Sequence, residues 1–145
     1  MARVKYVEVM LGENGKMPFR KYAGDAGHDL YVSNEAVIPP HTTMDVHTNI
    51  RIKMPPFIFA RIIGRSSTLR KHGLMVNEGI IDNGYTGELF ISVHNMTNQP
   101  FHVTPGMRLA QVIFHLIEDI RWSQVEDIPE SHNERNDSGF GSTGV

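Results

Sequence analysis

Residues 44–54 read Met-Asp-Val-His-Thr-Asn-Ile-Arg-Ile-Lys-Met, with apolar side chains at most even positions and polar ones at every odd position. Because successive side chains of a β-strand point to opposite faces, this alternation predicts a strand with one buried face. Residues 89–93 alternate in the same way, and the apolar runs 57–63 and 109–116 predict strands buried on both faces. Prolines and glycines separate these runs as turns do in a sandwich or barrel. The sequence predicts an all-β fold, and we expect a jelly-roll-like antiparallel barrel.

Two segments depart from the strand pattern. Residues 66–73 read Ser-Ser-Thr-Leu-Arg-Lys-His-Gly, which predicts one short helix with a Ser cap and a Gly stop. From residue 129 the chain is polar, with Phe140 as its one aromatic residue, so we expect a flexible arm. Glycines beside hydroxyls in this arm suit a phosphate, and Phe140 offers a stacking face. We therefore expect a barrel domain, residues 1–128, and a mobile Gly-rich arm, residues 129–145, which closes over a ligand.

Composition excludes several classes of protein. The 145 residues carry 14 Lys plus Arg against 16 Asp plus Glu, which does not predict a basic nucleic-acid-binding surface. The absence of cysteine excludes disulfides and thiolate metal sites. The eight histidines lack the spacing of a helical zinc site, so we expect no metal bound directly by protein side chains. No segment has the length and apolarity of a membrane span or signal peptide, so we expect a soluble, intracellular protein without a membrane partner.

The segment with the strongest functional pattern is residues 79–88, Gly-Ile-Ile-Asp-Asn-Gly-Tyr-Thr-Gly-Glu. Asn and Gly both tolerate positive φ, so an Asn-Gly pair between apolar runs predicts a β-hairpin. The hairpin would hold Asp82 beside a tight turn, with Tyr85 close by. A fixed carboxylate next to an aromatic ring and exposed amides is suited to binding a base and activating a water. An Asp that only forms the turn fits the same pattern.

Five short segments together resemble those of the homotrimeric dUTP pyrophosphatase (dUTPase) family, in the family's order. They are residues 26–30 (Ala-Gly-His-Asp-Leu), residues 64–67 (Gly-Arg-Ser-Ser), the segment around Asp82, residues 106–111 (Gly-Met-Arg-Leu-Ala-Gln) and the Gly-rich tail after Arg135. Each is weak alone, because short motifs of this kind occur by chance. The resemblance covers the chain from residue 26 to its end, and it implies cleavage of dUTP to dUMP and pyrophosphate, which limits uracil in DNA and supplies dUMP for dTMP synthesis.

The resemblance assigns Asp82 as the general base, since a carboxylate can take a proton from the water that attacks the α-phosphorus. Charge on the phosphoryl oxygens needs cationic and hydrogen-bonding partners. The residues implied for the phosphates are Arg65, Ser66, Ser67, Gln111, Arg135, Gly141 and Ser142. Those implied for the nucleoside are the backbone from Asn77 through Gly79, Ile80 and Ile81, the Tyr85 ring against the deoxyribose and the Phe140 ring over the uracil.

The family also implies a cofactor and an assembly. Mg²⁺ is expected on the phosphate oxygens and waters rather than on protein ligands. A homotrimer is expected in which each active site takes the hairpin from one subunit, the Arg-Ser-Ser segment from a second and the arm from a third. The compartment, cytoplasm or nucleus, would depend on the source.

Some positions depart from the family's pattern, and further functions stay open. Thr86 stands where the family often has Arg, which predicts the loss of an ion pair, and Asp137 adds a negative charge to the arm. For His28 we expect no catalytic role. A related dCTP deaminase would need a Glu where this chain has Ser92. A dUTPase-like regulatory binding protein and a β-barrel capsid or lectin module are two more functions that remain open.

Overall fold

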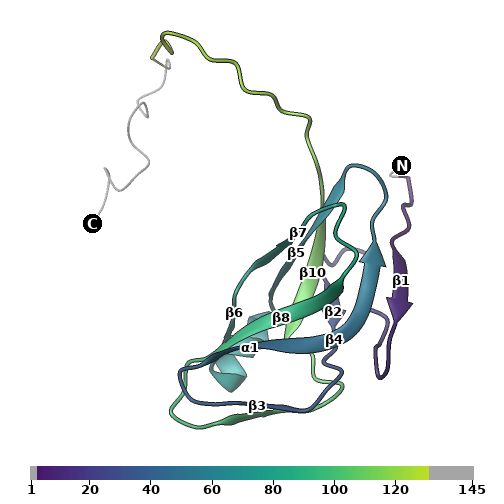
Figure 1. Ribbon diagram of the computed structural model, residues 1–145, viewed down its shortest axis with the longest axis vertical. Helices are drawn as coiled ribbons and strands as arrows, with labels where there is room; N and C mark the ends of the chain where they lie inside the picture. Colours follow the sequence, from purple (N-terminus) through teal and green to yellow (C-terminus); the bar gives the residue numbers. More distant parts are fainter. Residues whose placement is uncertain (1–2, 131–145) are drawn as a thin grey trace.

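The computed structural model describes residues 3–130, which form two four-stranded antiparallel sheets (Figure 1). The first sheet has the order β1 (Glu8–Leu11), β4 (Thr43–Lys53), β8 (Glu88–Asn95) and β6 (Leu74–Val76). The second has the order β2 (His28–Leu30), β10 (Ala110–Leu116), β5 (Ile58–Gly64) and β7 (Gly79–Ile81). A further pair joins β3 (Ala36–Ile38) to β9 (Phe101–Val103). The predicted mostly antiparallel β fold with one short helix is confirmed.

Both sheets contribute to one apolar core. In β4 the side chains of Val46, Ile50 and Ile52 are buried while their odd-numbered neighbours are mostly exposed, as the alternation predicts. The expectation that residues 57–63 are buried on both faces is wrong for the described chain. In β5 the even-numbered side chains are buried, but Phe59 and Ile63 on the other face are only half-buried. A single chain therefore covers only one face of this strand.

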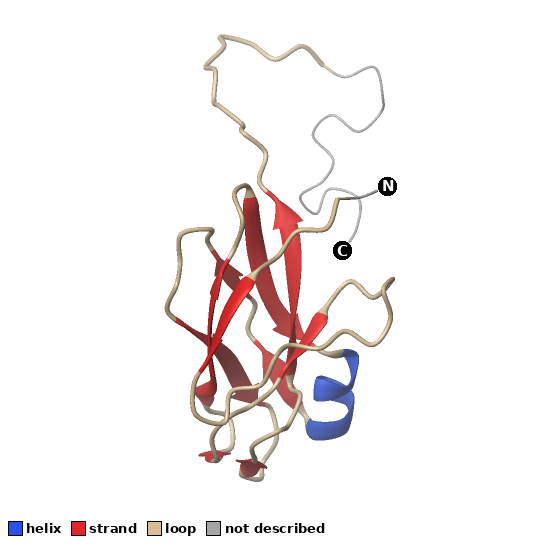
Figure 2. Cartoon of the chain, turned by 90° about the vertical axis from the view of Figure 1, so that its right-hand side faces the viewer, coloured by secondary structure: helices blue, strands red, loops and turns tan. Residues whose placement is uncertain are grey.

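The helix α1 (Ser66–His72) lies beside one end of the barrel (Figure 2). The predicted Ser cap is wrong, because Arg65 is the N-cap residue and makes no side-chain cap bond. Ser66 is instead the first helical residue, and it is exposed. The predicted stop is confirmed, since Gly73 has a φ of 63° and its N–H bonds the Leu69 carbonyl 3.0 Å away. The Thr68 hydroxyl bonds the Leu109 carbonyl at 2.7 Å, which fixes the helix to the start of β10.

The Asn-Gly pair does not close a two-stranded hairpin. β7 pairs with β5 in the second sheet, whereas β8 pairs with β4 and β6 in the first, so residues 82–87 cross between sheets. The turn is closed by the Tyr85 N–H, which bonds the Asp82 carbonyl at 3.0 Å. Neither Asn83 nor Gly84 has a positive φ. The hairpin prediction is wrong because β7 pairs with β5 and not with β8. The turn therefore does not join two strands that are paired with each other, and it needs no hairpin geometry.

After β10 the chain leaves the barrel at the end opposite α1 (Figures 1 and 2). Residues 117–130 contain exposed apolar side chains, and Trp122 is 100% exposed. The last strand ends at Leu116, and the predicted boundary between a barrel domain, residues 1–128, and an arm stays a prediction. The predicted arm residues Arg135, Phe140, Gly141 and Ser142 lie outside the described residues.

Within residues 3–130, no helix is both long and apolar enough to cross a membrane.

Candidate active site

Three of the five family-like segments meet at one cleft of about 470 Å³. The sheet order β2–β10–β5 brings them together, because β10 pairs Gln111 with Asp29 on one side and Ala110 with Gly64 on the other. The cleft is lined by Phe19, Arg20, Lys21, Tyr22, Asp25, Ala26, Gly27, Asp29, Arg65, Ser66, Arg108 and Gln111. Four of these side chains are cationic and two are carboxylates. The cleft is therefore suited to an anionic ligand.

Asp29 is the centre of the charged groups in this cleft. Its Oδ1 lies 2.9 Å from Nε of Arg65, and its Oδ2 lies 3.3 Å from Nη1 of Arg108. Nη1 of Arg65 also donates to the Arg108 carbonyl at 3.0 Å. One carboxylate thus orients two guanidinium groups, which retain donors that can bind phosphate oxygens.

Gln111 is fixed in the same cleft by its neighbours. Its Nε2 donates to the Gly64 carbonyl at 3.1 Å. A Cβ at position 27 would overlap the Gln111 side-chain amide, so Gly27 leaves the space that this amide occupies. Ser66, which is predicted for the phosphates, lines the cleft, whereas Ser67, also predicted for the phosphates, is half-buried and is not among the lining residues.

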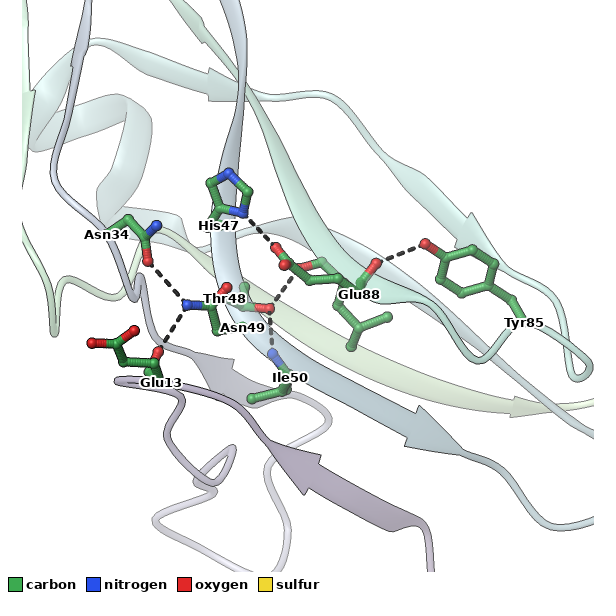
Figure 3. A network of polar contacts seen from close by, with 9 residues as sticks. Glu13, Asn34, His47, Thr48, Asn49, Ile50, Tyr85 and Glu88 are labelled. Carbon is green, nitrogen blue, oxygen red and sulfur yellow. Dashed lines mark hydrogen bonds and ion pairs between the residues drawn. The ribbon is translucent and has the colours of Figure 1, made fainter.

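A second group of predicted residues surrounds the turn after β7. Asp82 is exposed, and the Tyr85 hydroxyl donates to the Glu88 carbonyl at 2.7 Å (Figure 3). A Cβ on Gly87 would lie 2.7 Å from the Tyr85 hydroxyl, so only glycine leaves room for this ring. The Glu88 carboxylate lies 2.7 Å from Nδ1 of His47 on β4 (Figure 3). These contacts hold the aromatic ring beside the turn.

Arg51 holds the same turn from β4. Its Nε donates to the Thr86 carbonyl at 2.6 Å. The family's frequent Arg at position 86 is absent, as the sequence shows, but the backbone at this position is still bound by a guanidinium. A main-chain carbonyl is available whatever the side chain, which explains why Thr is compatible with an anchored turn.

The predicted base-recognition segment, residues 77–81, passes from the first sheet to the second. The Asn77 N–H bonds the Ser92 carbonyl at 2.8 Å, and its side-chain amide bonds the Ser92 hydroxyl at 3.1 Å. Beyond this pair the two chain segments separate, because Gly79–Ile81 joins β5 and Glu88–Asn95 stays with β4. β7 is one of the two edge strands of its sheet among the described residues. Alternate backbone groups of an edge strand point away from the sheet, where they can bind a planar ligand.

The two groups of residues lie at opposite ends of β5. Ile81 pairs with Ala60 near one end of that strand, and Arg65 follows its last residue, Gly64. Five residues of strand span about 16 Å, at roughly 3.3 Å per residue. One chain therefore brings Arg65, Ser66 and Gln111 together at one end of β5 and places Asp82 beyond the other end. The predicted base-recognition segment runs along β5 between them, with Ile81 opposite Ala60 and Gly79 opposite Ile62.

Some cleft residues were not predicted from the sequence. Arg108 lies within the fourth segment, and its positive charge between Gly106 and Gln111 was the available signal. Arg20 and Lys21 precede the first segment, where nothing in the local pattern distinguishes them from other surface cations.

Within residues 3–130, no group of three His, Cys, Asp or Glu side chains is placed to hold a metal.

His28 is not among the residues of this cleft, and it lines a separate, mainly apolar cavity of about 370 Å³ with Arg20 and Phe114. Its ring meets Phe114 edge to face, with 6.0 Å between centroids. Burial, helped by the charge of Arg20, lowers the pKa of His28. Its Nδ1 is buried without a hydrogen-bond partner among the described residues. The expectation that His28 is not catalytic stays a prediction.

Comparisons with known proteins identify a family and several relatives of this chain. The family model described as dUTPase matches residues 13–144. The deoxyuridine 5'-triphosphate nucleotidohydrolase of Clostridioides difficile is 40% identical over 136 residues, covering 92% of this chain and 94% of the relative. The enzyme of the same name from Clostridium novyi is 36% identical over 135 residues, with the same coverage. The structure of Staphylococcus bacteriophage 80alpha dUTPase with dUPNHPP has a TM-score of 0.87, at 26% identity over 98% of this chain and 100% of that one.

Proposed function

Because this chain belongs to the dUTPase family, we propose that the cleft around Asp29 binds the phosphates of dUTP and that Asp82 activates the attacking water. The chain is a hydrolase that converts dUTP to dUMP and pyrophosphate. The observation that carries the proposal is the pairing of one carboxylate, Asp29, with two arginines in a cleft that is rich in cationic side chains.

The phosphate half of the site is Arg65, Ser66, Gln111 and, in addition, Arg108. The guanidinium groups and the Gln111 amide are already held by protein contacts, so little side-chain freedom remains to be lost when phosphate binds. Donors fixed before the reaction stabilise the charge that spreads over the phosphoryl oxygens in the transition state. We keep Ser67 as a proposed phosphate-binding residue because it lies in the first turn of α1, next to Ser66.

The catalytic half of the site is the turn that carries Asp82. A carboxylate ionised at neutral pH accepts a proton from a water aligned on the α-phosphorus. The water oxygen forms a new bond to this phosphorus, which yields dUMP, and the bond to the bridging oxygen breaks to release pyrophosphate. The exposure of Asp82 in the described chain is compatible with its meeting a substrate from outside the barrel.

Uracil selection is proposed for the edge of β7, from Asn77 to Ile81. Backbone groups on this edge would pair with the uracil edge, and cytosine would present a donor where uracil presents an acceptor. Tyr85, which is fixed by its bond to Glu88, would pack on the deoxyribose and exclude a ribose hydroxyl. The residue at position 92 is Ser and bonds Asn77, which supports hydrolysis over deamination.

A homotrimer with shared sites is proposed from the separation of the two halves. Ala60, which pairs with the residue before Asp82, lies about 16 Å from Arg65 along β5, so a second copy of the chain would supply one half of each site. The half-buried outer face of β5 and the exposed apolar residues between 117 and 128 give further apolar surface for contacts between copies. The arm from residue 129, with Arg135, Phe140, Gly141 and Ser142, would close the site from a third copy.

Mg²⁺ is proposed to arrive with the triphosphate. The cationic lining of the cleft suits phosphate oxygens and does not suit a bare metal ion, and no full set of protein ligands gathers among residues 3–130. When bound, Mg²⁺ would neutralise charge on the phosphates. We also propose that the protein acts inside a cell, where dUTP is present.

The test is pyrophosphate release from dUTP, dCTP, dTTP and UTP, each with Mg²⁺ and with EDTA. Release from dUTP alone, abolished by EDTA, is the expected result. Release from dCTP or UTP at a similar rate would contradict base and sugar selection at β7 and Tyr85. Binding of dUTP without release would support a regulatory binding protein instead.

A further inference from the structure

Asn83 joins the turn after β7 to the connection between β4 and β5. Its Nδ2 donates to the Pro55 carbonyl at 2.8 Å and to the Ile58 carbonyl at 2.7 Å. Carbonyl oxygens only accept hydrogen bonds, so two carbonyl partners determine which end of the amide is the nitrogen. Asn83 is half-buried, and both of its amide protons are used.

The connection that accepts these bonds is itself held in place. Met54 and Ile58 at its ends are buried in the core, and Pro55 and Pro56 restrict the backbone between them. The Phe57 carbonyl accepts the Ile117 N–H at 2.8 Å, which attaches the exit of β10 to the same connection. Asn83 is therefore bound to a stiff part of the barrel.

The same turn carries the proposed base one residue earlier. Asp82 is exposed, and its carbonyl closes the turn with the Tyr85 N–H at 3.0 Å. Since the turn crosses between two sheets and is not held by a strand ladder, side-chain bonds contribute to its position relative to the barrel. Arg51 anchors its far end through the Thr86 carbonyl, and Asn83 anchors the end next to Asp82.

From these contacts we infer that Asn83 is a positioning residue, which holds the turn so that the Asp82 carboxylate meets its water at a fixed place. The inference rests on the proposed role of Asp82. Asn83 itself touches neither substrate nor water in this scheme. A base displaced by about 1 Å can reduce the rate about 100-fold, so a side chain that fixes the base has a large effect on turnover.

The experiment measures kcat, KM and the affinity for the non-hydrolysable nucleotide dUPNHPP in Asn83→Ala and Asn83→Asp. Asn83→Ala removes both donors, and we expect kcat to fall about 10- to 100-fold, with the affinity changed less than about threefold. Asn83→Asp keeps the shape of the side chain, but its carboxylate oxygens would face two carbonyl oxygens with no proton to share between them. We therefore expect kcat to fall at least as far. Asn83→Ser, a smaller side chain that keeps one hydroxyl donor, is measured in the same way and keeps the test valid if Asn83→Ala does not fold.

Asn95→Ala is the structural control, although Asn95 is fully buried and its side-chain oxygen also accepts two bonds from Thr97. Nδ2 of Asn95 also donates to two carbonyls, those of Ile38 at 3.0 Å and Gln99 at 2.8 Å, beyond the opposite end of β8. Its loss should lower the melting temperature and leave kcat within about twofold of the parent when measured well below unfolding, because stability and turnover are separate readouts. An equal loss of kcat in Asn83→Ala and Asn95→Ala would overturn the inference.

A double-mutant cycle with Asp82→Asn separates the inference from the proposed function. If Asn83 acts through Asp82, then Asn83→Ala should cause no further loss of the residual turnover of Asp82→Asn. An undiminished additional loss would show that Asn83 acts by another route. A parent-like kcat in Asn83→Ala, with Asp82→Asn inactive, would overturn the positioning role alone. Full turnover in Asp82→Asn would instead overturn the base assignment.

Discussion

The carboxylate of Asp29 holds the guanidinium of Arg65, with 2.9 Å between Oδ1 and Nε. Asp29 lies in β2 and Arg65 directly follows β5, and these two strands are not neighbours, because β10 lies between them. The pair joins the first and second family-like segments into one cleft, and the Arg65 guanidinium retains further N–H donors for phosphate.

Asp29→Asn should therefore weaken substrate use. The amide keeps the size of the side chain but removes the charge that orients Arg65 and Arg108. We expect kcat/KM for dUTP to fall about tenfold, which corresponds to about 1.4 kcal/mol. Steady-state kinetics would measure this. Asp25→Asn is the control, since Asp25 lines the same cleft but its carboxylate bonds the Tyr22 N–H. Equal losses in both variants would mean that only the total charge of the cleft matters.

Asp82→Asn should remove most turnover while substrate still binds. An amide has nearly the shape of the carboxylate but cannot accept the proton, and loss of a general base costs about 10²- to 10⁴-fold in rate. Single-turnover kinetics and titration with dUPNHPP would separate chemistry from binding. Parent-like turnover would exclude Asp82 as the base.

Mixing two inactive variants tests whether sites are shared between copies. Asp82→Asn and Arg65→Ala each damage a different half of the site. If the halves come from different subunits, random co-assembly of the two variants in equal amounts should restore about a quarter of the parent activity. Each half of a site then comes from an undamaged copy with a probability of about one half, and both halves must be undamaged. Activity no higher than that of the separate variants would place both halves in one chain.

Deleting residues 136–145 tests the predicted arm. We expect a sharp loss of catalysis with the trimer unchanged, since the arm would contribute Phe140 and Ser142 to the substrate but no part of the barrel. Light scattering and kcat/KM measured on one preparation would check both statements. A truncated protein that becomes monomeric would instead make the arm a structural strap between subunits.

His28 should make stability depend on pH. Burial, together with Arg20, lowers its pKa in the folded chain below the ordinary value of 6.5, so the unfolded chain binds the proton more tightly. The contribution of neutral His28 to the free energy of unfolding is complete above the pKa that His28 has in the unfolded chain. It is lost as the pH falls through the pKa of His28 in the folded chain. Urea unfolding from pH 8 to pH 5 should show a steeper loss of stability in the parent than in His28→Gln. Parallel curves would contradict this contribution.

Much of the fold could be predicted because strand and helix signals are local. Alternation in β4 and β8, and the glycine that ends α1, depend only on the direction of successive side chains and on the φ that Gly73 adopts. The Ser cap was predicted one residue too late, since caps depend on backbone geometry that sequence leaves open.

The candidate site was predictable only in part. Asp82, Tyr85, Arg65 and Gln111 were identified by their segments, and the structure shows which of them one chain brings together. Arg108 was missed because its role depends on Asp29, 79 residues away in the sequence. The role of Asn83 likewise depends on a carbonyl 28 residues distant.

The sequence by itself determined the strand pattern, the helix stop, the order of the five segments and hence the family. Only the tertiary structure decided that β7 joins β5 rather than β8, that Asp29 links two arginines, and that Asn83 anchors the turn of Asp82. The physical reason is the distance along the chain over which each interaction acts. Periodicity and turn propensity act over a few residues, whereas strand partners and polar contacts are selected by packing of the whole chain.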